Sequence, residues 1–215
     1  SAGIGNLRCV AFTGLHEGRH WVQMEILEGS YGGREGMDGM DAVDTLYANT
    51  RNNPIEDIES HLPLRVNRYE LRDQSPAKGK WRGGIGSVRE FAFLSDGAFS
   101  VEGEGHKYRP WGFAGGEEGS TASLSVLPAM GGETALPSKV PYRGANRGDR
   151  LKAIGPNGGG YGDPFEREPE AVLGDMLDGY ISAEQAQTDY GVVIRGKALD
   201  MGATSALRAR SAALR

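Results

Sequence analysis

Glycine is the residue that most constrains this chain, because it makes up 34 of the 215 residues and concentrates in three runs. These runs cover residues 28–39, 78–86 and 155–164. They follow no collagen-like period, and glycine favours tight turns over the interiors of helices and strands. We therefore expect a β-rich α+β fold of short antiparallel strands with Gly-rich turns, sandwich-like or barrel-like, rather than a doubly wound sheet.

The clearest helix start lies in the central block, residues 49–94. Asn53 is expected to act as the N-cap, Pro54 to take the first helical position, and Glu56 to complete a capping box from N3. The Leu62-Pro63 step should end this short helix, because the residue before proline disfavours helical geometry.

Two strands are expected after this helix. The apolar residues of 64–71 change phase near residue 67, which predicts a β-bulge. Residues 88–94 form the second strand, with Phe91 and Phe93 on one face. Both strands should therefore bury one side against a core.

Residues 16–20 read His-Glu-Gly-Arg-His and match the H-E-x-x-H zinc motif. That motif needs a helix to place both histidines on one face, and two glycines weaken a helix here. The residues of 20–26 instead alternate with period two, which places Trp21 and Glu25 on the same side. We expect a hairpin that joins strands at 7–12 and 20–26, with a zinc-binding helix as the weaker alternative.

The C-terminal part is expected to be mainly helical, with residues 1–165 β-rich and residues 166–215 helical. Pro169 should open a helix that ends at Gly179, and Ser182 with Gln185 predicts a capping box for a second helix. The first helix should bury an apolar stripe, composed of Val172, Leu173, Met176 and Leu177. The remaining expected elements are a strand at 190–195 and a packing or subunit-contact helix at 203–215.

Several groups of residues have both a functional and a structural interpretation. Consecutive backbone N–H groups in 28–39 or 155–164 could cradle an anion, but neither run has the features of a P-loop or dinucleotide fingerprint, so turns are favoured. The central arginines could clamp a carboxylate, or they could form cross-strand ion pairs, the set being Arg65, Arg68, Arg72, Arg82 and Arg89. His106 and the aromatic residues after it could line a pocket or could pack beneath a loop.

Charge and composition exclude several classes of function. A net charge of −5 and a pI near 5.5 argue against a nucleic-acid partner. The single cysteine, Cys9, cannot form an internal disulfide or a Cys-rich zinc site. No run of 18 apolar residues and no signal peptide is visible. We expect no membrane partner and a cytoplasmic location. The length of the chain allows one fairly large domain or two small ones.

Several motifs occur in an order that resembles the hydantoinase B/oxoprolinase family. NTRNNPIEDIE is followed by PLRVNRYELR and WRGGIGSVRE, and then by LPSKV, GDRL, GGGYGDP, PEAVL and DYGVV. The resemblance extends over nearly the whole chain. Family members are about twice this length or more, so the chain looks like the C-terminal part of such a subunit. Many members have His where this chain has Asp44 and Leu46, which argues against an imidazole-dependent role at those positions.

The resemblance implies a C-terminal segment or small subunit of an ATP-dependent hydrolase of cyclic amides such as hydantoin, 5-oxoproline or a lactam. It also implies two partners, an A-type subunit that binds ATP with Mg and the N-terminal part of the B-type subunit. A divalent metal, Zn or Mn, would be held by that N-terminal part, so we expect this chain alone to bind no metal or cofactor and to be inactive.

The residues expected nearest the substrate cavity are Asn49, Asn52 and Glu56. The two asparagines could orient an amide or carboxylate, whereas Glu56 should cap its helix. No catalytic residue can be named, since no nucleophile elbow, P-loop or Cys/His pair is present. The alternatives are part of an ATP-dependent acetone- or acetophenone-type carboxylase, and a non-catalytic assembly module.

Overall fold

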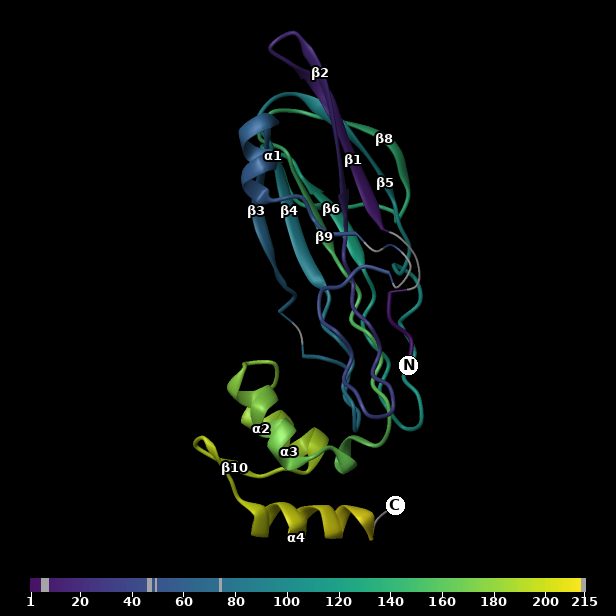
Figure 1. The fold of residues 1–215 in the computed structure, drawn as a ribbon, viewed down its shortest axis with the longest axis vertical. Coiled ribbons are helices and arrows are strands. Elements are labelled where there is room, and N and C mark those ends of the chain that lie inside the picture. The colour runs from purple at the N-terminus through teal and green to yellow at the C-terminus, as the bar shows by residue number, and fades with distance from the viewer. Residues whose placement is uncertain (5–7, 46–47, 49, 74, 214–215) are drawn as a thin grey trace.

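Two antiparallel sheets form the upper part of the molecule in the computed structural model, which describes residues 1–4, 8–45, 48, 50–73 and 75–213 (Figure 1). The first sheet has the order β2-β1-β5-β8, and the second has the order β3-β4-β9-β6-β7. Their strands are β1 (Cys9–His16), β2 (Arg19–Ile26), β3 (Leu64–Leu71), β4 (Ser87–Phe93), β5 (Gly97–Glu102), β6 (Ser123–Leu127), β7 (Thr134–Ala135), β8 (Val140–Ala145) and β9 (Arg150–Ile154). The expected α+β fold with short antiparallel strands is confirmed.

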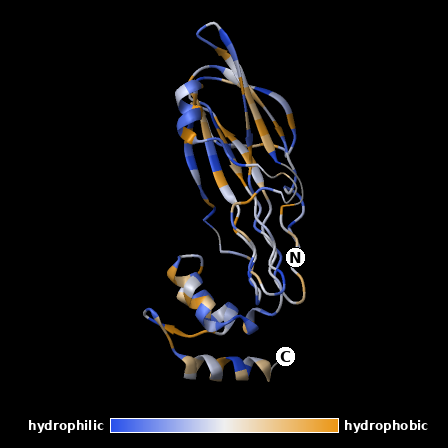
Figure 2. Cartoon of the chain, viewed as in Figure 1, coloured by the Kyte–Doolittle hydropathy of each residue, from blue (hydrophilic) through white to orange (hydrophobic). Residues whose placement is uncertain are grey.

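The main hydrophobic core lies between the two sheets. Phe12 of β1 meets Phe91 and Phe93 of β4, with ring centroids 4.9 and 5.8 Å apart respectively. All three side chains are fully buried, as are Val10 and Leu151. Figure 2 shows apolar residues along these strands and polar residues at the tip of the β1-β2 hairpin. The period-two pattern therefore places one face of each strand against the other sheet.

Helix α1 (Ile55–His61) forms where the sequence predicts it, but its cap differs. Pro54 is the N-cap residue and no side chain caps the helix, so the prediction for Asn53 and Glu56 is wrong. The Asn53 side-chain amide instead donates to Glu25 Oε1 at 3.3 Å, in the neighbouring sheet. A contact between distant residues has therefore replaced the local capping interaction.

The bulge predicted near residue 67 is confirmed, because the β3-β4 register shifts between Val66 and Arg68. Next to the bulge, Glu59 Oε1 accepts the backbone N–H of Val66 at 2.8 Å. Since β3 is the edge strand of its sheet, a backbone donor on the open edge is thus satisfied by the preceding helix.

A bundle of extended segments lies below the sheets, and we call it the glycine bundle (Figure 1). It comprises residues 28–41, 77–86, 110–119 and 155–162, which hydrogen-bond to one another through their backbones. A Cβ on Gly83 would lie only 2.0 Å from the carbonyl oxygen of Gly158. Many of the glycines predicted to form turns are therefore required for close backbone contact between extended segments.

The C-terminal part contains η1 (Pro164–Glu166), α2 (Pro169–Leu177), α3 (Ala183–Tyr190), β10 (Ile194–Arg195), β11 (Ala198–Leu199) and α4 (Met201–Ala212). The capping box of Ser182 and Gln185 is confirmed. The expected strand at 190–195 is wrong in its first part, because Tyr190 ends α3 and Gly191 caps it in the left-handed conformation. Within the described residues, no helix is long and apolar enough to cross a membrane.

The predicted apolar stripe of α2 is only partly buried. Val172 is fully buried, whereas Leu177 is 51% exposed. The buried position next to this stripe is occupied by a charged residue, Asp175. Helix α2 is therefore held by charge pairing as well as by apolar contact.

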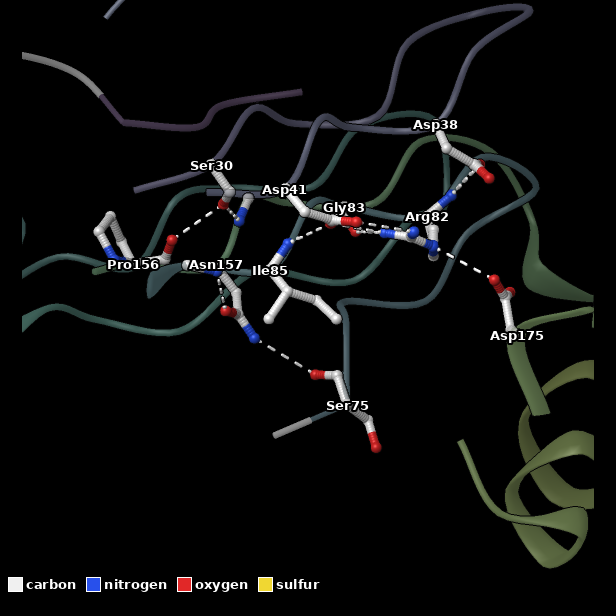
Figure 3. Close-up of polar contacts among 12 residues, drawn as sticks. Ser30, Asp38, Asp41, Ser75, Arg82, Gly83, Ile85, Pro156, Asn157 and Asp175 are labelled. Atoms are coloured by element: carbon white, nitrogen blue, oxygen red, sulfur yellow. Dashed lines mark hydrogen bonds and ion pairs between the residues drawn. The ribbon is translucent and has the colours of Figure 1, made fainter. Parts of the chain in front are cut away.

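Asp175 joins α2 to the glycine bundle through two arginines, Arg82 and Arg167, and Figure 3 shows its contact with Arg82. Its Oδ1 accepts from Arg82 Nε at 3.3 Å, and its Oδ2 accepts from Arg167 Nε at 3.0 Å. Arg82 also forms a two-point pair with Asp41, at 2.9 and 3.1 Å, and Arg167 forms one with Asp38. Burial raises the pKa of Asp175, although Arg167 and Arg82 oppose this effect. These pairs show that Arg82 has structural partners, which favours ion pairing over a free carboxylate clamp at this position.

Candidate functional site

A polar cavity of about 340 Å³ lies beside the chain that leaves β2, and we call it the Asn52 pocket. Asn52 lines it together with Glu28, Asp44 and Thr45. The other lining residues are Tyr31, Met40, Ala42, Val43, Thr50 and Arg51. The Gly-rich loop after β2 and the segment that leads into α1 thus converge on one cavity.

A buried network of charged residues forms the base of this pocket. The Glu28 carboxylate accepts hydrogen bonds from the Tyr69 hydroxyl at 3.2 Å and from Ser87 Oγ at 3.2 Å. Arg89 Nη1 lies 3.4 Å from Glu28 Oε1, and its Nη2 donates to Glu25 Oε2 at 2.8 Å. Asn52 Nδ2 donates to the Tyr69 hydroxyl, which connects the pocket to the network.

In this network two buried carboxylates, those of Glu25 and Glu28, pair with the one guanidinium of Arg89. The Arg89 guanidinium also lies 4.5 Å from the Tyr69 ring centroid in a cation–π arrangement, which adds an attractive contact. Burial and the neighbouring Glu28 carboxylate raise the pKa of Tyr69 to about 12. Tyr69 therefore remains a neutral hydrogen-bond donor at physiological pH.

The lining contains both hydrogen-bond acceptors and donors, because Arg51 and Asn52 line the pocket together with two carboxylates. The carboxylates of Glu28 and Asp44 both line the pocket. Among the described residues, Thr45 Oγ1 is buried and has no hydrogen-bond partner. A buried hydroxyl without a partner costs free energy unless a ligand or water satisfies it. The pocket is thus suited to a small polar molecule that can hydrogen-bond to Thr45 Oγ1.

The three predicted site residues do not all lie in the Asn52 pocket. Asn52 lines the pocket, whereas Glu56 is exposed on α1 and is not among the lining residues. Asn49 lies outside the described residues. The sequence interpretation missed Glu25, Glu28 and Tyr69 as members of the network. The alternation of β2 was the available signal, because it placed Glu25 on the same side as the large apolar Trp21.

The H-E-x-x-H motif does not form a metal site. His16 ends β1, Glu17 and Gly18 form the hairpin turn, and His20 lies in β2, so the zinc-binding helix is contradicted. In the part of the chain that the structure describes, no three His, Cys, Asp or Glu side chains are grouped to hold a metal ion.

The glycine run at 155–164 is not a free anion cradle. The N–H groups of Gly158, Gly159 and Gly160 donate to the carbonyl oxygens of Gly84, Ala2 and Glu117, at 3.0, 2.8 and 2.8 Å respectively. Since these donors are already used within the glycine bundle, they cannot also bind an anion.

A larger cavity of about 680 Å³ lies on another part of the surface, and we call it the Arg8 cavity. Its lining includes Arg8, His106, Tyr108 and Trp111. The prediction that His106 and the aromatic residues near it could line a pocket is therefore confirmed for these residues. Phe113 instead packs on Tyr161, with ring centroids 5.7 Å apart.

Comparison with known proteins finds relatives both by sequence and by structure. A Pseudomonas sp. (strain NS671) protein, provisionally named as the B component of a D-/L-hydantoinase, is 61% identical over 210 residues, which is 97% of this chain and 36% of that protein. The crystal structure of the ATP-dependent caprolactamase from Pseudomonas jessenii matches with a TM-score of 0.74 and 27% identity, over 94% of this chain and 37% of that chain.

A nucleotide-free structure of acetone carboxylase, from work on ATP-dependent acetone carboxylation, shares the fold. Its TM-score is 0.70 at 20% identity, over 96% of this chain and 33% of that chain. The chain therefore spans about a third of the length of each of these relatives. The profile of the family described as Hydantoinase B/oxoprolinase matches residues 1–164, and the chain belongs to this family.

Proposed function

We propose that this chain is the C-terminal segment or small subunit of an ATP-dependent hydrolase that opens cyclic amides such as hydantoins, 5-oxoproline or lactams. The observation that carries this proposal is the 61% identity, over 97% of the chain, to the protein provisionally named as the B component of a D-/L-hydantoinase. The similarity to the ATP-dependent caprolactamase supports the same class of reaction. The chain would act with an A-type nucleotide-binding partner and with the N-terminal part of the B-type subunit.

The proposed role of the Asn52 pocket is to bind and orient the ring. Thr45 Oγ1, buried and without a partner among the described residues, offers a polar contact to the ring. Glu28 and Asp44 also line the pocket, although their oxygens already accept hydrogen bonds within the chain. ATP held by the A-type partner would activate the carbonyl oxygen of the ring for hydrolysis. A divalent metal would be held outside this chain, because the described side chains provide no group that fits one.

The test is to reconstitute this chain with the A-type partner and the N-terminal part of the B-type subunit. The complete assembly should hydrolyse hydantoin, 5-oxoproline or caprolactam in an ATP-dependent manner. The chain alone should show no turnover. Hydrolysis by the isolated chain would refute the proposed division of roles.

The Asn52→Ala variant tests the pocket. Loss of the hydrogen bond to Tyr69 should lower kcat/KM by about tenfold. The matched control is Asn146→Ala, which truncates an exposed asparagine between β8 and β9 and should leave kcat/KM unchanged. Equal effects of the two variants would contradict the proposed pocket.

Two rival functions give different results in the same experiment. A carboxylase would convert a ketone with bicarbonate and ATP into a carboxylate product, which mass spectrometry detects. A non-catalytic assembly module would be required for assembly, measured by native mass spectrometry, but Asn52→Ala would then leave kcat/KM unchanged.

A further inference from the structure

The Arg8 cavity contains a buried charge without the partners that such a charge normally needs. Arg8 is 2% exposed, and among the described residues its Nε and Nη1 have no hydrogen-bond partner. Burial lowers the pKa of Arg8 to about 10, so the guanidinium is still charged at neutral pH. A buried guanidinium with unsatisfied donors costs free energy, which a bound anion would offset.

The other buried arginines show what Arg8 lacks. Arg89 pairs both terminal nitrogens with carboxylates of Glu25 and Glu28, and Arg82 pairs with Asp41 and Asp175. Glu28 also attracts Arg8 and raises its pKa, but the Glu28 oxygens accept from Tyr69, Ser87 and Arg89. The guanidinium of Arg8 therefore lacks the direct carboxylate contact that each of the others has.

The remaining wall of the cavity is largely apolar and includes exposed aromatic rings. Trp111 is 68% exposed and Tyr108 is 74% exposed, and Ile4 and Pro110 contribute aliphatic surface. Large exposed aromatics beside a cavity are typical of a surface that binds a partner or ligand.

The charged residues at the cavity are mostly basic, because Arg8, Lys107 and Arg109 line it with one acidic residue. Lys107 lies with its Nζ 5.1 Å from the Tyr108 ring centroid, and Arg109 is paired with Glu118 at 2.9 Å. Glu104 is the acidic residue in the lining. His106 has a pKa lowered by burial and by Arg8, which favours its neutral form. The charge of the lining thus favours an anionic ligand.

We propose that the Arg8 cavity binds a small organic acid, whose carboxylate pairs with the Arg8 guanidinium and whose apolar body lies against Trp111 and Tyr108. This cavity shares no lining residue with the Asn52 pocket, and the proposal does not rest on the proposed catalytic role. A carboxylate supplies two acceptors in a planar arrangement that matches guanidinium donors.

Isothermal titration calorimetry on the 215-residue chain tests the proposal with phenylacetate and its uncharged isostere phenylacetamide. We expect phenylacetate to bind about tenfold or more tightly than phenylacetamide, because a charge-assisted hydrogen bond is stronger than a neutral one. Equal affinities, or no binding of phenylacetate, would overturn the proposal.

The Arg8→Met variant keeps an unbranched apolar stem and removes the charge. It should lose the preference for phenylacetate while still binding phenylacetamide, which shows that the cavity remains folded. Arg147→Met, at an exposed position in the β8-β9 turn, is the matched control and should keep the preference. Unchanged discrimination in Arg8→Met would refute the role of Arg8.

The Trp111→Ala variant tests the apolar wall separately. It should lower the affinity for both ligands by a similar factor, because the indole contacts the apolar body rather than the carboxylate. Unchanged affinity for both ligands would contradict the proposed orientation.

Discussion

Arg89 joins the two sheets through a buried ion pair. Arg89 lies on the same face of β4 as Phe91 and Phe93, so its side chain points into the space between the sheets. There it pairs with Glu25 of the opposite sheet and with Glu28, and it stacks on the rings of Tyr69 and Phe91. The buried charge is tolerated because both of its terminal nitrogens are satisfied.

Replacement of Arg89 by Met should lower the free energy of unfolding by about 3–5 kcal/mol, because two buried carboxylates lose their partner. Urea denaturation measures this change. The matched control is Arg68→Gln, which removes an exposed pair with Glu70 and should cost less than about 0.5 kcal/mol. If the two variants cost the same, Arg89 does not carry the cross-sheet pairing.

Replacement of Tyr69 by Phe tests the raised pKa of this tyrosine. The folded-state pKa of about 12 exceeds the ordinary value of 10.0, so the native state holds this proton more tightly than the unfolded state. The resulting stabilisation is fully present below pH 10 and is lost as pH rises from 10 to about 12. Denaturation across this pH range should show a smaller loss of stability in Tyr69→Phe than in the wild type.

Absorbance titration at alkaline pH provides the second measurement for Tyr69. The wild type should contain a tyrosine transition near pH 12 that Tyr69→Phe lacks. Burial also raises the pKa of Tyr190, so a late transition should remain in the variant. If the two titration curves coincide, Tyr69 is not the group that titrates near pH 12.

Sequence patterns at the residue scale identified the direction of side chains better than their partners. Period two placed Glu25 on the side of Trp21, and the charge pattern predicted that Arg89 could form a cross-strand ion pair. Neither pattern could show that Glu25 and Arg89 meet, because the contact joins strands that are more than 60 positions apart. For Asn53 the local sequence predicted an N-cap, but its side chain instead hydrogen-bonds to Glu25, which is distant in sequence.

The elements of the fold differ in how far the local sequence determines them. The capping box of α3 and the bulge in β3 depend on neighbouring residues, and both are confirmed. The glycine bundle depends on contacts between segments such as 77–86 and 155–162, so composition alone suggested turns there. Its physical requirement is the absence of a side chain where two backbones meet.

Gly83→Ala tests the glycine bundle at the element scale. Its Cβ would lie 2.0 Å from the Gly158 carbonyl oxygen, so the backbones must separate, at a cost of about 3 kcal/mol. Gly174→Ala in α2 is the matched control, because a Cβ there meets nothing within 4 Å. That change should stabilise the protein by about 0.5–1 kcal/mol. Thermal denaturation measures both effects, and destabilisation of similar size in both variants would contradict the packing argument.

At the scale of the whole molecule, the sheets, the glycine bundle and the C-terminal helices follow one another along the long axis (Figure 1). The Asn52 pocket lies where chain from the first sheet enters the glycine bundle. Helix α2 is joined to that bundle by the pairs that Asp175 makes with Arg82 and Arg167. Asp175 is thus the buried carboxylate of an attachment that the pairs of Lys78 with Asp189 and of Lys80 with Glu166 also support.

Asp175→Asn tests this attachment with a side chain of nearly the same volume. The loss of charge should lower the free energy of unfolding by about 2 kcal/mol, which is less than for an isolated buried pair, because Arg82 keeps Asp41 and Arg167 keeps Asp38. Hydrogen exchange should become faster in α2 and α3 while β4 stays protected, since β4 belongs to the separate core between the sheets. Asp178→Asn, at the exposed end of α2, should leave the exchange of all three elements unchanged. Uniformly faster exchange in Asp175→Asn would instead mean that the helices and the sheets unfold as one cooperative unit.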